Sequence, residues 1–269
     1  MKPGDALADY MITDLLAGDG ATRVYGARPP ERLGLGAQRV AVKVRPGGDD
    51  QAFRRFSREL KMYARVADPG LLTVYDAGQH DTMFFYTTEW CDGGSLDTAA
   101  DLSRTVRLRA LARAARAVHA LHEAGIVHRD IRPATILLRS DQTAVLADLG
   151  AAHVGTATMT SMAPMASVGF VDPQLLMGEA ATRSTDIYAL GATLHRVLTG
   201  QHLHPHLGGS DMLLALRTVL SQAPRIDRAV LSAEEADLVA SCVDRRTDAR
   251  PPTAEAFAHL VDDLVERAP

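Results

Sequence analysis

Four charged residues in this chain have the types and the spacing that chemistry on a phosphate group requires. Asp130 ends the sequence H-R-D, and Asp148 follows it by 18 residues. Lys43 ends the β-branched run V-A-V-K, and Glu59 follows it by 16 residues. Carboxylates accept protons and bind divalent cations, and Lys is a compact point charge that suits phosphate oxygens. The elements that carry these residues decide whether they act together.

The stretch 127–138 has an apolar entry, a charged turn and an apolar exit, which indicates a loop held between two buried segments. A long helix is predicted before it, over 103–123, with an apolar face and Gly125 as its C-terminal stop. Strands are predicted at Leu137-Leu138 and at 144–147. This hairpin is expected to bring Asp130 and Asp148 to the same end.

The N-terminal third of the chain reads mainly as strands. A hairpin is predicted over 10–27, a strand over 39–44 and two further strands over 71–75 and 83–88. The segment 50–65 is predicted to be helical, because aromatic and apolar residues recur in it at three- and four-residue spacing. Sixteen residues separate Lys43 from Glu59, which suits a Lys on a strand facing a Glu on the next helix.

Taken together, these motifs resemble the protein kinase family. H-R-D-I-R-P-A-T resembles the catalytic loop H-R-D-L-x-x-x-N, V-A-V-K resembles the strand V-A-I-K, and D-L-G resembles D-F-G. Thr135 departs from the pattern, since the family has an Asn that binds a second metal ion there. The resemblance covers about residues 10–265 in the family's order. It implies catalytic roles for Asp130, Arg132, Lys43 and Glu59, and metal binding by Asp148 and, more weakly, Thr135.

The same resemblance implies an ATP site. Gly18-x-Gly20 looks like a shortened glycine-rich loop, although G-D-G by itself is more often a plain hairpin turn. The backbone of Glu89 and Cys91 would bind adenine, and Ser95 would reach the ribose. The residues expected to bind ATP are Gly18, Gly20, Val24, Ala41, Lys43, Glu89, Cys91, Ser95 and Leu137.

Further residues match structural or activating positions of the family. Ser167 aligns with a hydroxyl residue that contacts the catalytic loop, and Gln174 stands where the family has a Glu that pairs with an Arg, here Arg250. Asp186 matches a buried acid that braces the catalytic loop, with a helix N-cap as the alternative. The structural set is therefore His128, Arg129, Ser167, Gln174, Asp186 and Arg250. Candidate phosphorylation sites within 156–167 are Thr156, Thr158, Thr160 and Ser161.

Composition narrows the function classes. The net charge of −4 gives no sign of a nucleic-acid or anionic-membrane surface, and no run of 18 apolar residues or signal peptide is present. Two distant cysteines favour a reducing cytoplasm. Only three of the 29 basic residues are Lys, so a Lys at position 43 is notable, and the chain has no Asn. His202, His204 and His206 alternate in a loop, for which solvation is favoured over metal binding.

These observations predict an α+β, two-lobed protein-kinase-like fold. Residues 1–91 would form a mostly β N-lobe with one regulatory helix, and residues 92–269 a mostly α C-lobe. In the C-lobe, helices are predicted over 186–199, ended by Gly200, and over 211–221, 233–243 and 254–265. The expected function is transfer of the γ-phosphoryl group of ATP to a Ser or Thr of a protein substrate, with Mg²⁺ or alternatively Mn²⁺, and with autophosphorylation as a candidate activity. The alternative is a pseudokinase scaffold, which is motivated by the shortened glycine loop and by Thr135, Arg23 and Gln174. A small-molecule kinase is a third reading, which the segment 167–174 argues against.

Overall fold

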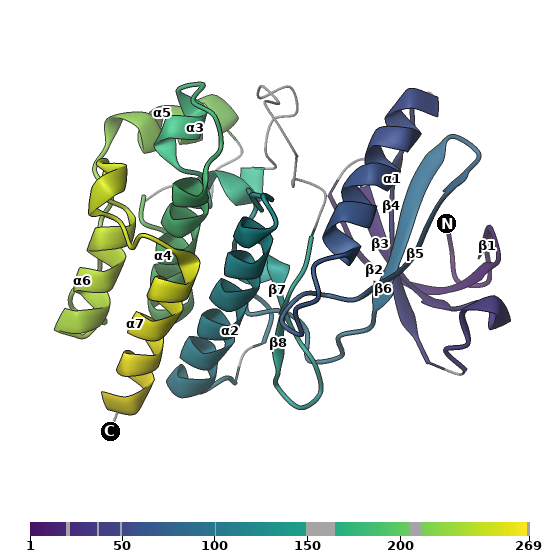
Figure 1. Ribbon diagram of the computed structural model, residues 1–269, viewed down its shortest axis with the longest axis horizontal. Coiled ribbons are helices and arrows are strands. Elements are labelled where there is room, and N and C mark those ends of the chain that lie inside the picture. The colour runs from purple at the N-terminus through teal and green to yellow at the C-terminus, as the bar shows by residue number, and fades with distance from the viewer. Residues whose placement is uncertain are drawn as a thin grey trace. The chain divides into compact units, whose positions relative to one another are not determined.

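The computed structural model describes residues 1–19, 22–36, 38–48, 50–99, 101–148, 165–204 and 211–267. The chain divides into two compact units (Figure 1). The first unit comprises Met1–Ala67 and Leu72–Asp92, and the second comprises Asp68–Leu71 and Gly93–Pro269. The first is built on a β-sheet and the second mainly on helices, which confirms the predicted α+β class.

The first unit contains an antiparallel six-stranded sheet of order β1-β2-β3-β4-β6-β5 and the helix α1. A cluster of buried side chains from β2, β3, β4 and β6 packs against one face of this sheet, and Tyr10, Tyr25 and Val42 are among its members. The predicted hairpin over 10–27 is confirmed as β2 and β3. The bounds are β1 Ala6–Leu7, β2 Tyr10–Asp19, β3 Thr22–Arg28, η1 Glu31–Leu33, β4 Val40–Pro46, α1 Asp50–Ala64, β5 Val74–His80 and β6 Met83–Glu89.

The helix α1 packs on the sheet through aromatic rings. Phe56 stacks on Phe84 with 5.5 Å between the ring centroids, and it lies 6.2 Å from Tyr86. Phe84 and Tyr86 lie opposite Arg45 and Lys43 in the register of β6 with β4, and residues directly opposite each other share a face of a sheet. The helix therefore covers the face of β4 that carries Lys43.

The second unit consists of helices and a short hairpin. Helix α2 packs against α7 and β8, and α4 packs against α6. Predicted helices over 103–123, 211–221, 233–243 and 254–265 are all confirmed to within two residues. The bounds are α2 Arg104–Glu123, η2 Pro133–Thr135, β7 Ile136–Leu138, β8 Ala144–Leu146, η3 Met165–Phe170, α3 Pro173–Leu176, α4 Arg183–Thr199, α5 Met212–Ser221, α6 Ala233–Cys242, η4 Thr247–Ala249 and α7 Ala254–Arg267.

Local sequence explains how α2 begins and ends. The Ser103 hydroxyl accepts a hydrogen bond from the Val106 amide at 3.2 Å, which satisfies one of the unpaired amides of the first turn. At the other end Gly125 has a φ of 75°, a left-handed conformation that glycine adopts without strain. These two signals fix the point at which the chain leaves the helix for the segment around Asp130.

The predicted strand over 71–75 is wrong at its start. Leu71 belongs to the second unit, where it forms a parallel bridge with Leu146, and the strand β5 begins only at Val74. An apolar run of this length does not reveal its partner. Leu71 and Leu72 are buried, but Leu71 is not part of the sheet to which Val74 belongs.

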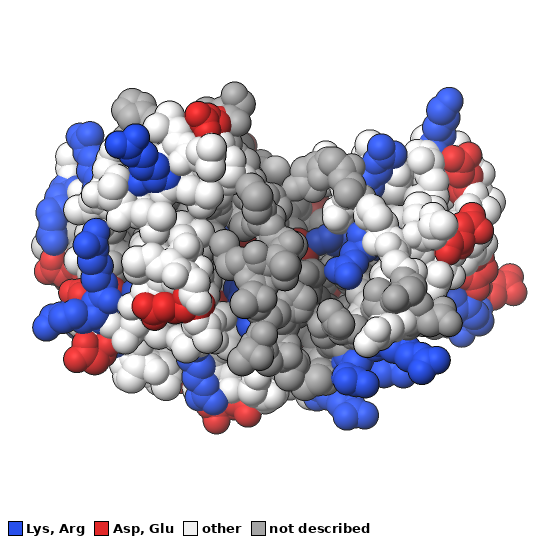
Figure 2. Space-filling model, turned by 90° about the horizontal axis from the view of Figure 1, so that it is seen from above, with Lys and Arg blue, Asp and Glu red and all other residues white. Residues whose placement is uncertain are grey.

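Both signs of charge are distributed over the surface. On the face shown in Figure 2, each unit carries Lys or Arg and Asp or Glu side chains. Among the described residues, no helix has the length and apolar character needed to span a bilayer.

Candidate active site

The loop around Asp130 is anchored by buried isoleucines on both sides. Ile126, Ile131 and Ile136 are each at most 3% exposed, so apolar burial fixes the loop at its entry, middle and exit. Helix α4 contributes a further anchor, because the buried Thr193 hydroxyl donates a hydrogen bond to the carbonyl of Ile131 at 3.3 Å. The polar residues of the loop, Asp130 among them, therefore lie between segments that are buried or hydrogen-bonded.

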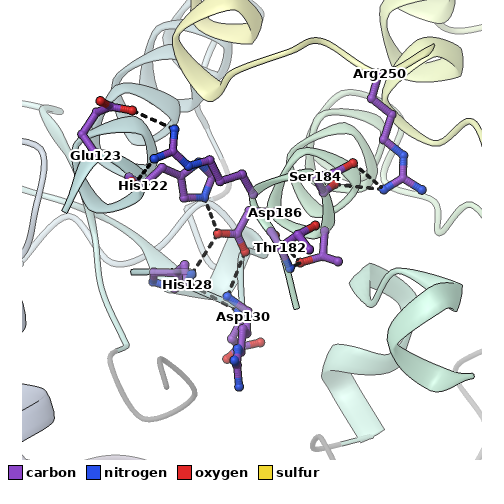
Figure 3. Close-up of polar contacts among 11 residues, drawn as sticks. His122, Glu123, His128, Asp130, Thr182, Ser184, Asp186 and Arg250 are labelled. Atoms are coloured by element: carbon purple, nitrogen blue, oxygen red, sulfur yellow. Dashed lines mark hydrogen bonds and ion pairs between the residues drawn. The ribbon is translucent and has the colours of Figure 1, made fainter. Parts of the chain in front are cut away.

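Asp186 braces the loop backbone from α4. Its carboxylate accepts hydrogen bonds from the amides of His128 at 2.8 Å and Arg129 at 2.9 Å (Figure 3). It also lies 2.7 Å from Nε2 of His122, and both side chains are 1% exposed. Arg129 has a φ of 69°, which is costly for a residue with a side chain, and the bond from its amide to Asp186 helps to hold that conformation.

Asp186 is not the N-cap of its helix. Helix α4 begins at Arg183, and Thr182 caps it through a reciprocal pair of hydrogen bonds with Thr185. The N-cap alternative for Asp186 is therefore wrong, and the helix starts three residues earlier than its sequence indicated. Thr182 and Ser184 give no apolar periodicity, which is why the first turn escaped prediction.

The loop also holds the residue that precedes Asp148. The amide of Ala147 donates to the carbonyl of Thr135 at 2.8 Å, and its own carbonyl lies 3.1 Å from Nε2 of His128. Nδ1 of His128 accepts from the Asp130 amide at 3.4 Å, so Nε2 carries the proton and donates to Ala147. Asp148 thus follows directly after a residue that is tied to the Asp130 loop on both sides.

The carboxylate of Asp130 is partly exposed and only partly engaged. Oδ1 accepts hydrogen bonds from Nε of Arg132 at 3.1 Å and from the Ser167 hydroxyl at 3.0 Å. The Asp130 side chain is 13% exposed, and none of the described residues donates a hydrogen bond to its Oδ2. One oxygen is thereby oriented by the protein, while the other is able to accept a proton from a ligand.

Thr135 is buried and acts within the loop. Its hydroxyl accepts from the Arg132 amide at 3.1 Å and lies 2.8 Å from the Asp130 carbonyl, to which it donates. The residue is 2% exposed. A hydroxyl has one proton and two lone pairs, so these contacts leave one lone pair for a metal ion.

In the first unit, the register places three of the predicted ATP-binding residues on one face. Ala41 and Lys43 alternate along β4 with the buried Val40, Val42 and Val44, so they point to the opposite face. Val24 of β3 lies directly opposite Lys43. Gly18 lies on β2 opposite Arg23, while Gly20 and the side chain of Glu59 lie outside the described residues.

Of the remaining predicted ATP-binding residues, Glu89 ends β6, Cys91 and Ser95 follow it in the chain, and Leu137 lies on β7. The Glu89 amide donates to the Thr73 carbonyl at 3.0 Å, and Cys91 follows two residues later. Ser95 is buried in the second unit, where it bridges to Leu137 of β7, and its hydroxyl lies 3.1 Å from that of Thr98.

The predicted pairing of Gln174 with Arg250 is wrong. Arg250 forms an ion pair with Asp172, with 2.5 Å between Nη1 and Oδ2, and the two side chains are 1% and 0% exposed. Gln174 instead donates to the Arg245 carbonyl at 3.3 Å. A buried guanidinium requires a charged partner, and Asp172, two residues before Gln174, supplies it.

Neutral groups also contact the Arg250 side chain. The guanidinium also donates to the Ser184 carbonyl at 2.9 Å and, through Nε, to the Asp244 carbonyl at 2.9 Å. It lies over the ring of Tyr188, and burial raises the pKa of that phenol. These contacts tie α3, α4 and the segment before α7 to one cation.

The histidines after α4 form no metal cluster among the residues that the structure describes. Burial lowers the pKa of His202, and the nearby Arg196 lowers it further. His204 is 1% exposed, and neither of its ring nitrogens has a hydrogen-bond partner within the part of the chain that the structure describes. His206 and the proposed phosphorylation sites Thr156, Thr158, Thr160 and Ser161 lie outside the described residues.

Two residues of this region were missed in the sequence. His122 occupies the apolar face of α2, four residues after Val118, and a buried His at such a position needs a polar partner. Asp172 precedes a Pro, and its Oδ1 caps α3 through the Gln174 amide at 3.0 Å. Asp followed by Pro is a sequence pattern that indicates a helix N-cap, here that of α3. No residue near Asp172 in the sequence indicates its ion pair with Arg250.

This fold and loop define a protein kinase domain. The chain belongs to that family, since the protein kinase domain model matches residues 32–261. The chain is also similar to named bacterial kinases. The DNA damage-responsive serine/threonine-protein kinase RqkA of Deinococcus radiodurans is 32% identical over 278 residues, covering 97% of this chain and 40% of that protein.

Two other relatives are more distant. The serine/threonine-protein kinase PknJ of Mycobacterium tuberculosis is 28% identical over 96% of this chain and 46% of its own length. The serine/threonine-protein kinase PrkC of Bacillus subtilis is 30% identical over 81% of this chain and 34% of its own length. The chain therefore spans less than half the length of each of these relatives.

Proposed function

We propose that this chain catalyses transfer of the γ-phosphoryl group of ATP to a Ser or Thr hydroxyl of a protein. The observation that carries the proposal is the state of the Asp130 carboxylate: Arg132 and Ser167 orient Oδ1, and no described residue donates a hydrogen bond to Oδ2. The bonds that Ala147 forms with the same loop support a joint role for Asp148. The relatives' names support a protein kinase over a scaffold without activity.

Each residue has a distinct task in the proposed reaction. The substrate oxygen forms a bond to the γ-phosphorus while the bond to the leaving ADP oxygen breaks, and Oδ2 of Asp130 takes up or orients the hydroxyl proton. Arg132 places a cation beside the transferred group. Lys43 binds the α- and β-phosphates, and Glu59 on α1 orients it, which the position of α1 on the Lys43 face favours.

The residues present suit a divalent cation, Mg²⁺ or alternatively Mn²⁺. Asp148 offers carboxylate oxygens, which such hard cations prefer, and Thr135 offers one hydroxyl lone pair. The bound cation supplies charge neutralisation on the phosphate oxygens. Thr135 is a poor ligand because its hydroxyl already serves the loop, so we propose weak binding at the position that it lines.

The rest of the nucleotide would be held by residues of β2, β3, β4 and the segment after β6. Gly18, Gly20 and Val24 would cover the phosphates and Ala41 the adenine. The Glu89 and Cys91 backbone would bind the adenine edge, Leu137 its lower surface, and Ser95 the ribose. The sequence Arg132-Pro133 favours Ser or Thr over Tyr as the acceptor.

The test is the intact mass of the purified chain after incubation with Mg-ATP, with Asp130→Ala as the matched variant. Added phosphate on the wild type alone supports the proposal, and peptide mapping then locates it within or outside 156–167. A protein substrate such as myelin basic protein is included, because the chain itself is not required to be a substrate. Equal phosphate incorporation by wild type and Asp130→Ala would show that Asp130 does not carry the reaction.

A further inference from the structure

A cavity of about 350 Å³ opens in the second unit beside the Asp130 loop. Pro133, three residues after Asp130, forms one wall. Three residues of extended chain span at most about 10 Å, so this wall lies within a few residues' reach of the proposed catalytic carboxylate. The other lining residues are Leu96, Asp97, Arg107 and the end of α4, residues 196–200.

The wall formed by α4 is fixed relative to the loop. Thr193 bonds to the Ile131 carbonyl, and Arg196 follows Thr193 by three residues, roughly one helical turn. The same contact that holds the catalytic segment therefore also fixes the backbone of α4 near Arg196. The Arg196 side chain extends from this fixed backbone into the lining of the cavity.

The cavity carries more positive than negative side chains. Arg107 and Arg196 line it, against the single carboxylate of Asp97. Arg107 donates to the carbonyls of Leu102 at 3.2 Å and Ala99 at 3.5 Å. Its guanidinium is thus held against the backbone on the cavity's edge.

Most N–H groups of the Arg196 guanidinium have no hydrogen-bond acceptor among the described residues. Among the described residues its guanidinium donates only to the carbonyl of Gly200, the C-cap of α4, and no described carboxylate pairs with it. A guanidinium has five N–H groups in a fork that matches an anionic oxygen pair. Capping the helix uses one of them and offsets the partial negative charge of that helix end, and no described residue accepts a hydrogen bond from the others.

We propose that this cavity binds an anionic side chain of the protein substrate, a carboxylate or a phosphate, about two to five residues from the Ser or Thr that is phosphorylated, with Arg196 as the main recognising residue. The inference rests on the proposed kinase function and adds the substrate class. The competing explanation is that Arg196 only caps α4. That explanation predicts a loss of stability without a change in peptide preference.

The test compares Ser-containing peptides that carry Glu, Gln, Lys or phosphoserine at each position from −5 to +5, at low and at high salt. For wild type, we expect Glu at one position to raise kcat/KM about fivefold over Gln and phosphoserine to raise it further, with both effects reduced at high salt. Arg196→Gln removes the preference, and Arg196→Glu reverses it in favour of Lys. Arg109→Gln, an exposed Arg on α2 that does not line the cavity, leaves it unchanged.

Equal kcat/KM for Glu and Gln peptides at every position overturns the proposal, as does a Glu preference that survives in Arg196→Gln. If wild type phosphorylates no peptide, the affinities of the labelled Glu and Gln peptides are measured by fluorescence anisotropy without nucleotide. This measurement tests anion binding by the cavity independently of catalysis. If wild type binds the Glu peptide more tightly than the Gln peptide and Arg196→Gln does not, the proposed anion site is supported even though the proposed kinase function has failed. Equal binding of both peptides rejects the cavity as well.

Discussion

The ion pair between Asp172 and Arg250 allows a clear test, because the resemblance to the kinase family assigns the role of Arg250 partner to Gln174 instead. We compare Asp172→Asn with Gln174→Ala. Asn keeps the side-chain oxygen that caps α3 and removes only the negative charge, so it leaves the buried Arg250 guanidinium without a counter-ion. Gln174→Ala removes one partly exposed hydrogen bond, the one to the Arg245 carbonyl.

The magnitudes are well separated. Removing one partner of a buried ion pair costs about 3–5 kcal/mol, because the remaining charge stays desolvated. Part of this is recovered here, since the Ser184 and Asp244 carbonyls still accept from Arg250, so we expect about 3 kcal/mol for Asp172→Asn. Loss of the Gln174 bond costs about 0.5–1.5 kcal/mol. For a chain of this size 1 kcal/mol corresponds to a shift of about 2–4 °C in the unfolding midpoint.

Differential scanning fluorimetry of the two variants beside wild type measures these shifts. Asp172→Asn should lower the midpoint by about 6–12 °C and Gln174→Ala by about 1–6 °C, so at any one conversion factor the loss for Asp172→Asn is at least about twice as large. Arg250→Lys is a useful third variant, because Lys keeps the charge but loses the Nε donor to Asp244. A larger loss for Gln174→Ala than for Asp172→Asn would refute the assignment of the ion pair.

Three further predictions follow from the loop and the buried histidines. Thr135→Asn should lower the Mg²⁺ concentration needed for half-maximal transfer by on the order of tenfold, and an unchanged Mg²⁺ dependence would contradict our account of the second metal. In Asp186→Asn, one carboxylate oxygen becomes an NH₂ group, so the backbone amide of His128 or Arg129 loses its acceptor. We expect the free energy of unfolding to fall by about 1–3 kcal/mol in thermal unfolding and kcat to fall by at least about tenfold. Burial lowers the pKa of His195, His202 and His204, so they bind protons more tightly in the unfolded chain. Stability is then greatest above pH 6.5 and falls as the pH drops through 6.5 toward the lowered pKa values, and His204→Leu should make the fall shallower by up to about 1.4 kcal/mol per pH unit in urea titrations. An identical slope in wild type and His204→Leu would show that His204 does not titrate on unfolding.

Much of the fold could be predicted from the sequence, because residues close together in the chain determine where its helices and hairpins begin and end. The apolar stripe and Ser103 and Gly125 located α2, and Gly200, with a φ of 71°, ended α4 as expected. The hairpin β2–β3 and the strand with Lys43 followed from β-propensity and turn residues. In each case the determining interactions lie within a few residues of one another.

The errors arose where the partner is distant in the chain. Arg250 selects Asp172 over Gln174 across 78 residues, a choice governed by burial and charge in the folded state. The strand β5 contains polar residues and glycine and exists because β6 pairs with it, so its pattern did not set its start. The sequence shows that His122 is a polar residue on the apolar face of α2. It does not identify the partner of His122, because Asp186 lies 64 residues further along the chain.

The short segment Asp68–Leu71 has a practical consequence for dissecting the molecule. It belongs to the second unit although it precedes the end of the first in the chain, and it supplies the Gly70 carbonyl that accepts from the Leu146 amide at 2.7 Å. The Pro69 carbonyl also accepts from Arg113 at 3.0 Å. A recombinant fragment that starts at Gly93 would therefore lose a strand-like neighbour of β8, and expression of the second unit alone calls for a circular permutation or a fused copy of residues 68–71.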